Sequence, residues 1–186
     1  MRQDDLTRER AETAAVRAAR TPGDVALARS LFVEYARWLK VDLCFQDFER
    51  ELAELPGAYA PPQGRLLLAG APGQAFGCVG LRPLAAACGC GQSAPGADGI
   101  GEVKRLYVQP ARRGQGWGER LAQAVVAEAR SIGYRELKLD TLAWMAEARA
   151  LYARLGFRQC APYYANPLDG VVYMSLALAP HAERAA

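Results

Sequence analysis

One segment, residues 101–119, constrains the fold of this chain more than any other. It reads GEVKRLYVQPARRGQGWGE: a strand-like run ends at Val108, Pro110 breaks it, and a glycine-rich turn leads into a helix. Glycines let backbone N–H groups approach a ligand closely, and a helix N-terminus carries a partial positive charge. Arg112 and Arg113 add two full charges at the same place. The segment therefore predicts a site for a phosphate or pyrophosphate group, with a flexible glycine turn as the alternative.

Spacing excludes two other phosphate-binding patterns. The dinucleotide fingerprint requires a glycine three positions after its second glycine, and this chain has Glu119 there. The P-loop requires a Gly-Lys-Ser/Thr tripeptide, which the sequence lacks. The turn must therefore bind its anion in another way.

Hydrophobic periodicity along the chain predicts an α+β fold. Strands are expected at 14–18, 65–71, 74–82, 102–108, 136–140, 157–161 and 171–178, and helices at 22–40, 46–55, 119–132 and 145–155. Thr21 is the expected N-cap of the first helix, Gly133 closes the third, and residues 84–99 form a loop. This order predicts a mostly antiparallel mixed sheet of about six or seven strands flanked by about four helices.

The content of histidine and cysteine restricts the chemistry. The one histidine, His181, lies near the C-terminus, so a Ser-His-Asp triad, a Cys-His pair or a multi-histidine metal site is not expected. Acid–base chemistry must then use Glu, Asp, Tyr, Cys or Lys. The cysteines at 44, 78, 88, 90 and 160 are scattered and fit reduced thiols. Cys88 and Cys90 lack two further ligands nearby, so no metal is expected.

Composition narrows the class of protein further. No apolar run is long enough to cross a membrane and the N-terminus has no apolar signal segment, so we expect a cytoplasmic protein without a membrane partner. A formal net charge of +3 gives no argument for nucleic acid. We expect one domain over residues 13–180, between polar tails at 1–12 and 181–186.

Three motifs together resemble the GNAT (N-acetyltransferase) superfamily. That family's acetyl-CoA signature, Arg/Gln-x-x-Gly-x-Gly/Ala, is matched by Arg113-Gly114-Gln115-Gly116-Trp117-Gly118. Residues 104–110 (KRLYVQP) resemble the preceding strand, and residues 148–157 (ARALYARLGF) resemble the family's A-x-x-L-Y-x-x-x-G-F helix. The resemblance extends from about Ala14 to Leu178 and implies a GNAT-like fold.

The resemblance also implies how the chain holds acetyl-CoA. The backbone of Leu106, Tyr107 and Val108 would pair with the pantetheine arm like an added strand. The pyrophosphate would lie against the turn and the first residues of its helix, namely Arg113, Gly114, Gln115, Gly116, Trp117, Gly118 and Glu119.

Catalytic roles follow from the same resemblance. A backbone N–H near Leu106 would stabilise the oxyanion, and Tyr152 would protonate the departing thiolate, with a core aromatic as the alternative role of Tyr152. Glu102 is the expected general base, acting through a water, because residues i and i+4 of a strand share a face. The alternative for Glu102 is a solvated carboxylate at the start of a strand.

The chain departs from the family pattern at one cofactor position and leaves the acceptor open. Met145 stands where the family often has an asparagine that helps to hold the cofactor, and Trp117 is bulkier than usual, either packing or covering the cofactor. Candidate acceptor contacts are Glu34, Tyr35, Tyr163, Tyr164 and Asn166, and Glu34 is also a second candidate for the general base. For the two tyrosines of the 162–170 loop, packing onto the core is the alternative.

The expected function is transfer of an acetyl group from acetyl-CoA to a primary amine of a small molecule, protein or peptide. Direct attack in a ternary complex is favoured because no cysteine falls in the matched catalytic segments. The alternatives are a covalent cysteine route, an acyl-CoA-binding module without turnover, and a longer acyl donor. A homodimer is a possible assembly, and the sequence does not name the acceptor.

Overall fold

The computed structural model describes residues 14–41, 47–84 and 99–178 of the 186-residue chain. The predicted tails at 1–12 and 181–186 lie outside the described residues, as does most of the 84–99 loop. The predictions for four single residues also fall there: Cys44, Cys88, Cys90 and His181. No helix in the described ranges is long and apolar enough to cross a membrane.

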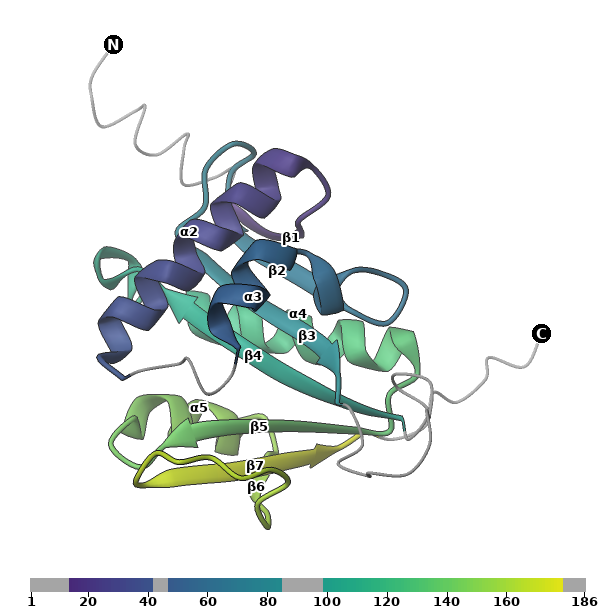
Figure 1. The fold of residues 1–186 in the computed structure, drawn as a ribbon, viewed down its shortest axis with the longest axis vertical. Helices are drawn as coiled ribbons and strands as arrows, with labels where there is room; N and C mark the ends of the chain where they lie inside the picture. Colours follow the sequence, from purple (N-terminus) through teal and green to yellow (C-terminus); the bar gives the residue numbers. More distant parts are fainter. Residues whose placement is uncertain (1–13, 42–46, 85–98, 179–186) are drawn as a thin grey trace, which may run out of the picture.

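Seven strands within the described ranges form one sheet, in the order β1-β2-β3-β4-β5-β7-β6 (Figure 1). Neighbouring strands are antiparallel except β4 and β5, which run parallel. The strands are β1 (Ala15–Ala18), β2 (Arg65–Gly70), β3 (Gly77–Pro83), β4 (Ile100–Val108), β5 (Glu136–Leu142), β6 (Arg158–Gln159) and β7 (Val171–Ala177). The predicted fold class, a mostly antiparallel mixed sheet with flanking helices, is confirmed.

Helices cover both faces of this sheet (Figure 1). On one face lie α2 (Pro22–Leu39) and α3 (Phe48–Glu54), and on the other lie α4 (Trp117–Ile132) and α5 (Ala146–Arg154). Strand β2 shows the alternation that separates the two cores. Leu66 and Leu68 pack with residues of α2, whereas Leu67 and Ala69 pack with residues of α4.

The helix ends agree with their sequence signals. The Thr21 hydroxyl accepts the N–H of Asp24, and the Asp24 carboxylate accepts the N–H of Thr21, so α2 begins with a capping box. Gly133 ends α4 with a φ of 97°, a left-handed conformation that favours glycine.

Strand bounds differ most from the predicted ones at β3 and β6, whereas β4 begins two residues earlier and β5 ends two residues later than predicted. Strand β3 begins at Gly77 rather than at 74, because Gln74 and Phe76 donate backbone hydrogen bonds to Ala71 and Ala69 within the turn. Strand β6 keeps two residues of the predicted 157–161, since it pairs with β7 only at its first positions.

Strands β4 and β5 pair only at their beginnings. Their parallel register runs from Ile100 opposite Glu136 to Glu102 opposite Lys138, and no further pairing between them is present in the described strands. Beyond that point the two strands diverge, and the sheet opens in its middle (Figure 1). This divergence positions the candidate site.

Candidate active site

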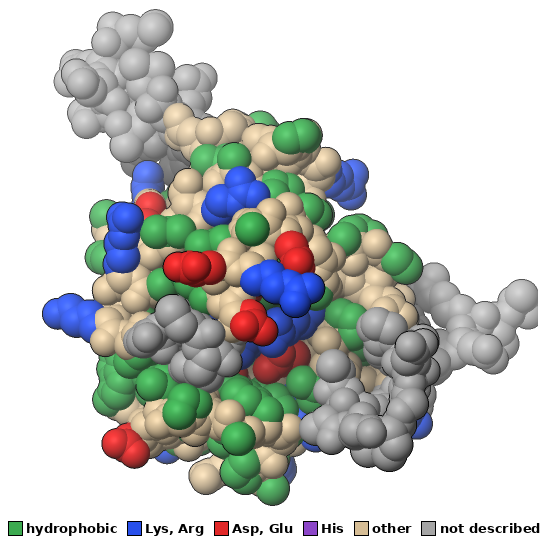
Figure 2. Space-filling model, in the orientation of Figure 1, with side chains coloured by type: hydrophobic (Ala, Val, Ile, Leu, Met, Phe, Trp, Pro, Cys, Tyr) green, Lys and Arg blue, Asp and Glu red, His purple; other side chains and the backbone are tan. Residues whose placement is uncertain are grey.

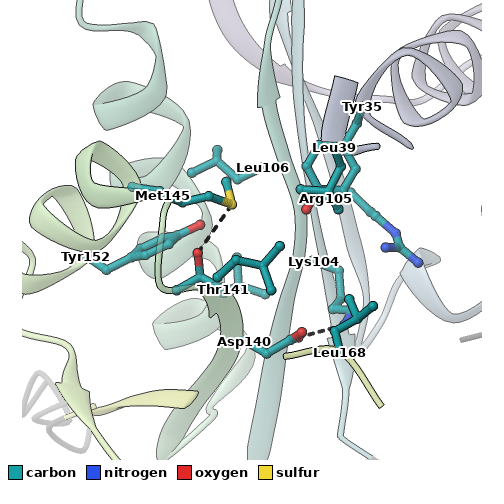
Figure 3. Close-up of a pocket in the computed structure, with 13 residues that line it drawn as sticks. Tyr35, Leu39, Lys104, Arg105, Leu106, Asp140, Thr141, Met145, Tyr152 and Leu168 are labelled. Carbon is teal, nitrogen blue, oxygen red and sulfur yellow. Dashed lines mark hydrogen bonds and ion pairs between the residues drawn. The ribbon is translucent and has the colours of Figure 1, made fainter. Parts of the chain in front are cut away.

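A small cavity of about 70 Å³ lies where β4 and β5 diverge (Figure 3). Its walls come from α2, β4, β5 and α5, and from Leu168 in the loop before β7. The lining residues are Tyr35, Leu39, Val103, Lys104, Arg105, Leu106, Asp140, Thr141, Leu142, Met145, Ala148, Tyr152 and Leu168. Two residues predicted to be catalytic, Leu106 and Tyr152, therefore border one cavity.

Tyr152 occupies the α5 wall of this cavity and is 8% exposed. Its ring packs edge-on against Phe157 with centroids 5.6 Å apart. Tyr152 is therefore also part of the hydrophobic core, which is the alternative role predicted from the sequence. Burial raises the pKa of Tyr152 above its ordinary value, with smaller contributions from Tyr35 and Asp140. The phenol is therefore protonated at neutral pH and able to donate its proton.

Strand β4 contains a bulge next to Leu106. Between Cys78 and Gly80 of β3 the register slips, so one extra residue of β4 is accommodated there. Arg105 adopts a φ of +59°, which is uncommon for a residue with a side chain. The Cys78 thiol donates to the Arg105 carbonyl oxygen at 3.4 Å. Together these features define the backbone conformation immediately before Leu106.

The bulge overturns one argument made from the sequence. Glu102 and Leu106 were expected to share a face of the strand, as residues i and i+4 do in regular β structure. The extra residue shifts the alternation: Leu106 packs with the core on the α4 side, while Tyr107 packs on the α2 side. Glu102 does not line the cavity and is 2% exposed, so it is also not a solvated carboxylate. Its role as base stays a prediction.

A larger cavity of about 450 Å³ adjoins the same strand and leads to the glycine-rich turn. Five of the predicted cofactor-binding residues line it, together with residues of α2, α5 and the turn after β5. The lining residues are Trp38, Leu106, Tyr107, Val108, Arg113, Gly118, Trp144, Met145, Ala146, Glu147, Ala148 and Leu151. Leu106, Met145 and Ala148 border both cavities.

The turn before α4 presents its backbone to open space. Gly114 and Gly116 have φ angles of +74° and +79°, and a Cβ at either position would have no neighbouring atom within 4 Å. Gly116 is the N-cap of α4, and no side chain caps that helix end. The first N–H groups of a helix lack intrahelical partners, so this end is free to receive an anion. These features fit the pyrophosphate of acetyl-CoA.

The other predicted residues of the turn differ in their surroundings. The Arg113 guanidinium stacks on Trp38 at 4.4 Å and donates from Nε to the Val108 carbonyl at 3.0 Å. Trp117 is buried against Phe76, with ring centroids 5.0 Å apart, so it packs into the core. Gln115 bonds within the turn, to the Ala111 carbonyl. The side chain of Glu119 lies 3.9 Å from that of Arg154.

Met145 borders both cavities. It stands at the position where the resemblance to the GNAT family would place an asparagine. The Thr141 hydroxyl lies 3.7 Å from its sulfur, in a contact that a thioether accepts weakly. Met145 therefore supplies an apolar wall and no amide group.

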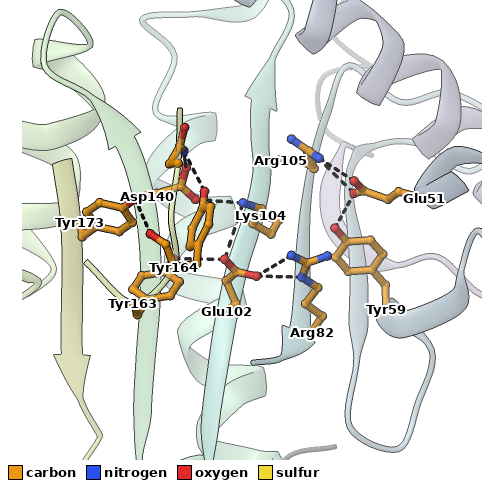
Figure 4. A network of polar contacts seen from close by, with 11 residues as sticks. Glu51, Tyr59, Arg82, Glu102, Lys104, Arg105, Asp140, Tyr163, Tyr164 and Tyr173 are labelled. Carbon is orange, nitrogen blue, oxygen red and sulfur yellow. Dashed lines mark hydrogen bonds and ion pairs between the residues drawn. The ribbon is translucent and has the colours of Figure 1, made fainter. Parts of the chain in front are cut away.

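A network of charges lies beside the small cavity, on the face of the sheet that carries α2 and α3 (Figures 2 and 4). Arg82 pairs with Glu102 at 2.7 Å, and the Lys104 ammonium lies 2.9 Å from Asp140 and 3.6 Å from Glu102. The Arg105 guanidinium bonds to Glu51 through two nitrogens. We call Glu51, Arg82, Glu102, Lys104, Arg105 and Asp140 the charged network.

Burial alone would raise the pKa values of Asp140 and Glu51, but their cationic partners outweigh it. The Lys104 ammonium holds the pKa of Asp140 below its ordinary value. Bonds from Arg105, and from the Tyr59 hydroxyl at 2.5 Å, do the same for Glu51. Both carboxylates are therefore ionised at neutral pH.

Four of the five predicted acceptor contacts touch this site. Tyr35 lines the small cavity, and burial raises its pKa to about 12. The Tyr163 hydroxyl donates to Glu102 at 3.1 Å. The Asn166 amide donates to Asp140 at 3.3 Å and to the Tyr164 hydroxyl at 2.9 Å. The fifth residue, Glu34, instead accepts two bonds from the side chain of Gln109.

Several residues of the site were not singled out from the sequence. Glu51, Arg82, Lys104 and Asp140 are brought together from α3, β3, β4 and β5. The signal available was the run of charged residues inside the predicted strand 102–108, since charges in a central strand need buried partners. Within the described residues, no group of three or more His, Cys, Asp or Glu is placed to hold a metal ion.

Comparison with known proteins agrees with this geometry. Residues 28–157 match the model of the acetyltransferase (GNAT) family. An uncharacterized N-acetyltransferase of Schizosaccharomyces pombe is 36% identical over 162 residues, which cover 87% of this chain and 93% of the relative. The chain therefore belongs to the GNAT acetyltransferase family, as its motifs predicted.

Solved structures show the same fold. A GNAT acetyltransferase of Staphylococcus aureus aligns with a TM-score of 0.69 at 16% identity, over 89% of this chain and 99% of its own. An acetyltransferase of Salmonella typhimurium, whose structure contains its cofactor acetyl-CoA, aligns with a TM-score of 0.62 at 21% identity. That alignment covers 93% of this chain and 98% of the other.

Proposed function

We propose that this chain transfers an acetyl group from acetyl-CoA to a primary amine of a small molecule by direct attack. The observation that carries the proposal is the cavity between β4 and β5, which Leu106 and the buried hydroxyl-bearing Tyr152 both border. The larger cavity and the uncapped end of α4 provide space for the pantetheine arm and the pyrophosphate. Acetyl-CoA supplies the activated thioester.

In the proposed reaction, different residues of the chain assist different steps of the transfer. The amine loses a proton and its nitrogen attacks the thioester carbon, the C–N bond forms and the C–S bond breaks. The N–H near Leu106 stabilises the negative charge that develops on the carbonyl oxygen. Tyr152 donates its proton to the departing thiolate and regains one from the nitrogen through solvent. The products are an acetylated amine, free thiol and one proton released to solvent.

The first proton needs an acceptor, and two carboxylates of the charged network are candidates. Glu102 was predicted from the sequence and would act through a water, although Arg82 and Tyr163 already engage its oxygens. Asp140 lines the cavity directly. Replacing each by its amide and comparing the acid limbs of the pH–rate profiles assigns the role.

Direct transfer is preferred over a covalent cysteine route. Neither described cysteine, Cys78 or Cys160, lines either cavity. The Cys78 thiol is buried, which raises its pKa and suppresses the nucleophilic thiolate. The size of the small cavity, about 70 Å³, favours an acetyl group over a longer acyl chain.

The test is thiol release from acetyl-CoA with and without a panel of primary amines, with the acetylated product identified by mass. We expect release that depends on the amine and falls for propionyl- and butanoyl-CoA. Binding of acetyl-CoA without release for any amine would replace the enzyme by the second candidate, an acyl-CoA-binding module. The Met145 side chain, which brings no amide to the larger cavity, is the observation that favours this second candidate.

A further inference from the structure

The charged network borders the place where the acceptor amine must arrive. Lys104, Arg105 and Asp140 line the cavity that Tyr152 also lines. Their side chains are 6%, 3% and 13% exposed. Burying ion pairs costs desolvation energy, and apolar residues of similar size are often as stabilising or more so. A stability role alone therefore gives a weak account of six ionic groups of which three line this cavity and three, Glu51, Arg82 and Glu102, pair in the network beside it.

The signs in the network balance. Three cations, Arg82, Lys104 and Arg105, face three carboxylates, Glu51, Glu102 and Asp140. A polyamine would meet as many cations as carboxylates and gain little net attraction. A molecule with one positive and one negative end can place each end against an opposite charge. The arrangement is thus complementary to a zwitterion.

Donors for a carboxylate remain on two of the cations. Arg82 and Arg105 each bind their internal carboxylate through Nε and Nη2. In the described part of the chain, neither Nη1 takes part in a hydrogen bond, and neither is among the buried nitrogens without a partner. A guanidinium offers five N–H donors in a plane, which suits a second carboxylate beside the first. Arg82 is the more accessible, with 31% of its side chain exposed.

We propose that the acceptor is a small amino carboxylate, such as an amino acid, whose carboxylate binds Arg82 and Arg105 and whose amino group lies toward Asp140. This inference rests on the proposed acetyl transfer. Asp140 is the network's carboxylate on the cavity wall, so it draws the ammonium end toward Leu106 and Tyr152. Figure 4 shows Arg82 and Arg105 at one end of the network and Asp140 at the other.

The experiment measures thiol release with the twenty standard amino acids, β-alanine and γ-aminobutyrate, each beside its carboxamide. Putrescine and spermidine serve as amines without a carboxylate. We expect at least one amino carboxylate to exceed its carboxamide in kcat/KM by about 10- to 100-fold, the value of a hydrogen-bonded charge. Equal rates for acid and carboxamide, or turnover of the polyamines alone, would overturn the proposal.

A matched pair of variants locates the carboxylate site. Arg82→Gln is expected to lower the acid-to-carboxamide ratio by about 10-fold, because one of the two charged donors is gone while Arg105 remains. Arg82→Lys should retain part of the ratio and guards against a merely unfolded glutamine variant. Arg65→Gln is the control: Arg65 is 21% exposed, pairs with Glu128 at 2.6 Å and donates to the carbonyls of Pro62 and Gly64 rather than to the charged network. An undiminished ratio in folded Arg82→Gln would contradict the assignment.

The outcomes also separate this inference from the proposed function. Acetylation of amines that lack a carboxylate would leave acetyl transfer standing and remove the amino carboxylate. Binding of acetyl-CoA without acetylation of any amine would remove both. Only preferential use of an amino carboxylate that depends on Arg82 supports the inference.

Discussion

The Glu51 carboxylate accepts two hydrogen bonds from the Arg105 guanidinium, at 2.5 Å from Nη2 and 3.1 Å from Nε. Arg105 is the residue of β4 with a φ of +59°, and Phe48 lies 5.0 Å from its guanidinium. Helix α3 thus holds the irregular residue that directly precedes Leu106. Because Leu106 contributes the proposed oxyanion donor, Glu51 is a positioning residue.

We expect Glu51→Gln to lower kcat by about 10- to 100-fold, since misplacement of a reacting group by about 1 Å has costs of this size. The free energy of unfolding should fall by about 3–5 kcal/mol, as when one partner of a buried ion pair is removed. Steady-state kinetics below the melting temperature and urea unfolding measure the two effects. Glu54→Gln is the control on the same helix, where an exposed carboxylate pairs with Arg50, which is also exposed. A loss of stability with kcat intact would make Glu51 purely structural.

The second prediction concerns the contribution of the glycine-rich turn to acetyl-CoA affinity. We expect Arg113→Glu to weaken acetyl-CoA binding by about 10- to 100-fold, because the variant replaces a cation on the wall of the larger cavity, where we propose that the cofactor binds, by an anion. Calorimetry measures the affinity. Tryptophan fluorescence reports binding independently, since Trp38 and Trp144 line the same larger cavity. Arg158→Glu, on the exposed edge strand β6, makes the same charge change elsewhere. Equal losses in both variants would show a general charge effect rather than a site.

The start of α2 predicts a pH dependence of stability. Burial would raise the pKa of Asp24, but bonds from the N–H groups of Arg20 and Thr21 and from the Arg17 guanidinium lower it from 3.8 to about 2. A depressed pKa stabilises the fold above the unfolded value of 3.8, and this contribution is lost as pH falls through about 2.

Asp24→Asn should therefore be less stable than the parent at pH 5, and the difference should shrink as pH approaches 2. Urea unfolding at a series of pH values gives the difference directly. A gap that stays constant over this range would show that the charge of Asp24 contributes nothing beyond its hydrogen bonds.

The helix boundaries and the turn before α4 were predictable because each of these features depends on residues that are close in sequence. Thr21 with Asp24, and Gly133 at the end of α4, mark helix boundaries within a few positions of sequence. The strand–turn–helix segment at 101–119 is likewise predicted from neighbouring residues, and Gly114 and Gly116 take the positive φ angles that its turn needs.

The site was only partly predictable because its chemistry joins distant segments. Arg105 and Glu51 are 54 positions apart, and Lys104 and Asp140 are 36 positions apart, so no spacing rule connects them. A positive φ at an arginine also cannot be predicted from the local sequence, since glycine is the residue that usually indicates such a conformation. The sequence therefore did not predict the bulge at Arg105. It also did not predict that Glu102 and Leu106 fail to share one face of the strand.

The most direct test of the account is Tyr152→Phe, measured for both turnover and acetyl-CoA binding. Tyr134→Phe is the control, because Tyr134 is also buried but its hydroxyl donates to the Gln63 carbonyl away from either cavity. The account predicts a fall in kcat of about 10²- to 10⁴-fold, the range for loss of a general acid, with acetyl-CoA affinity retained. An unchanged kcat in folded Tyr152→Phe would contradict the assignment of Tyr152 as the proton donor and with it the proposed mechanism.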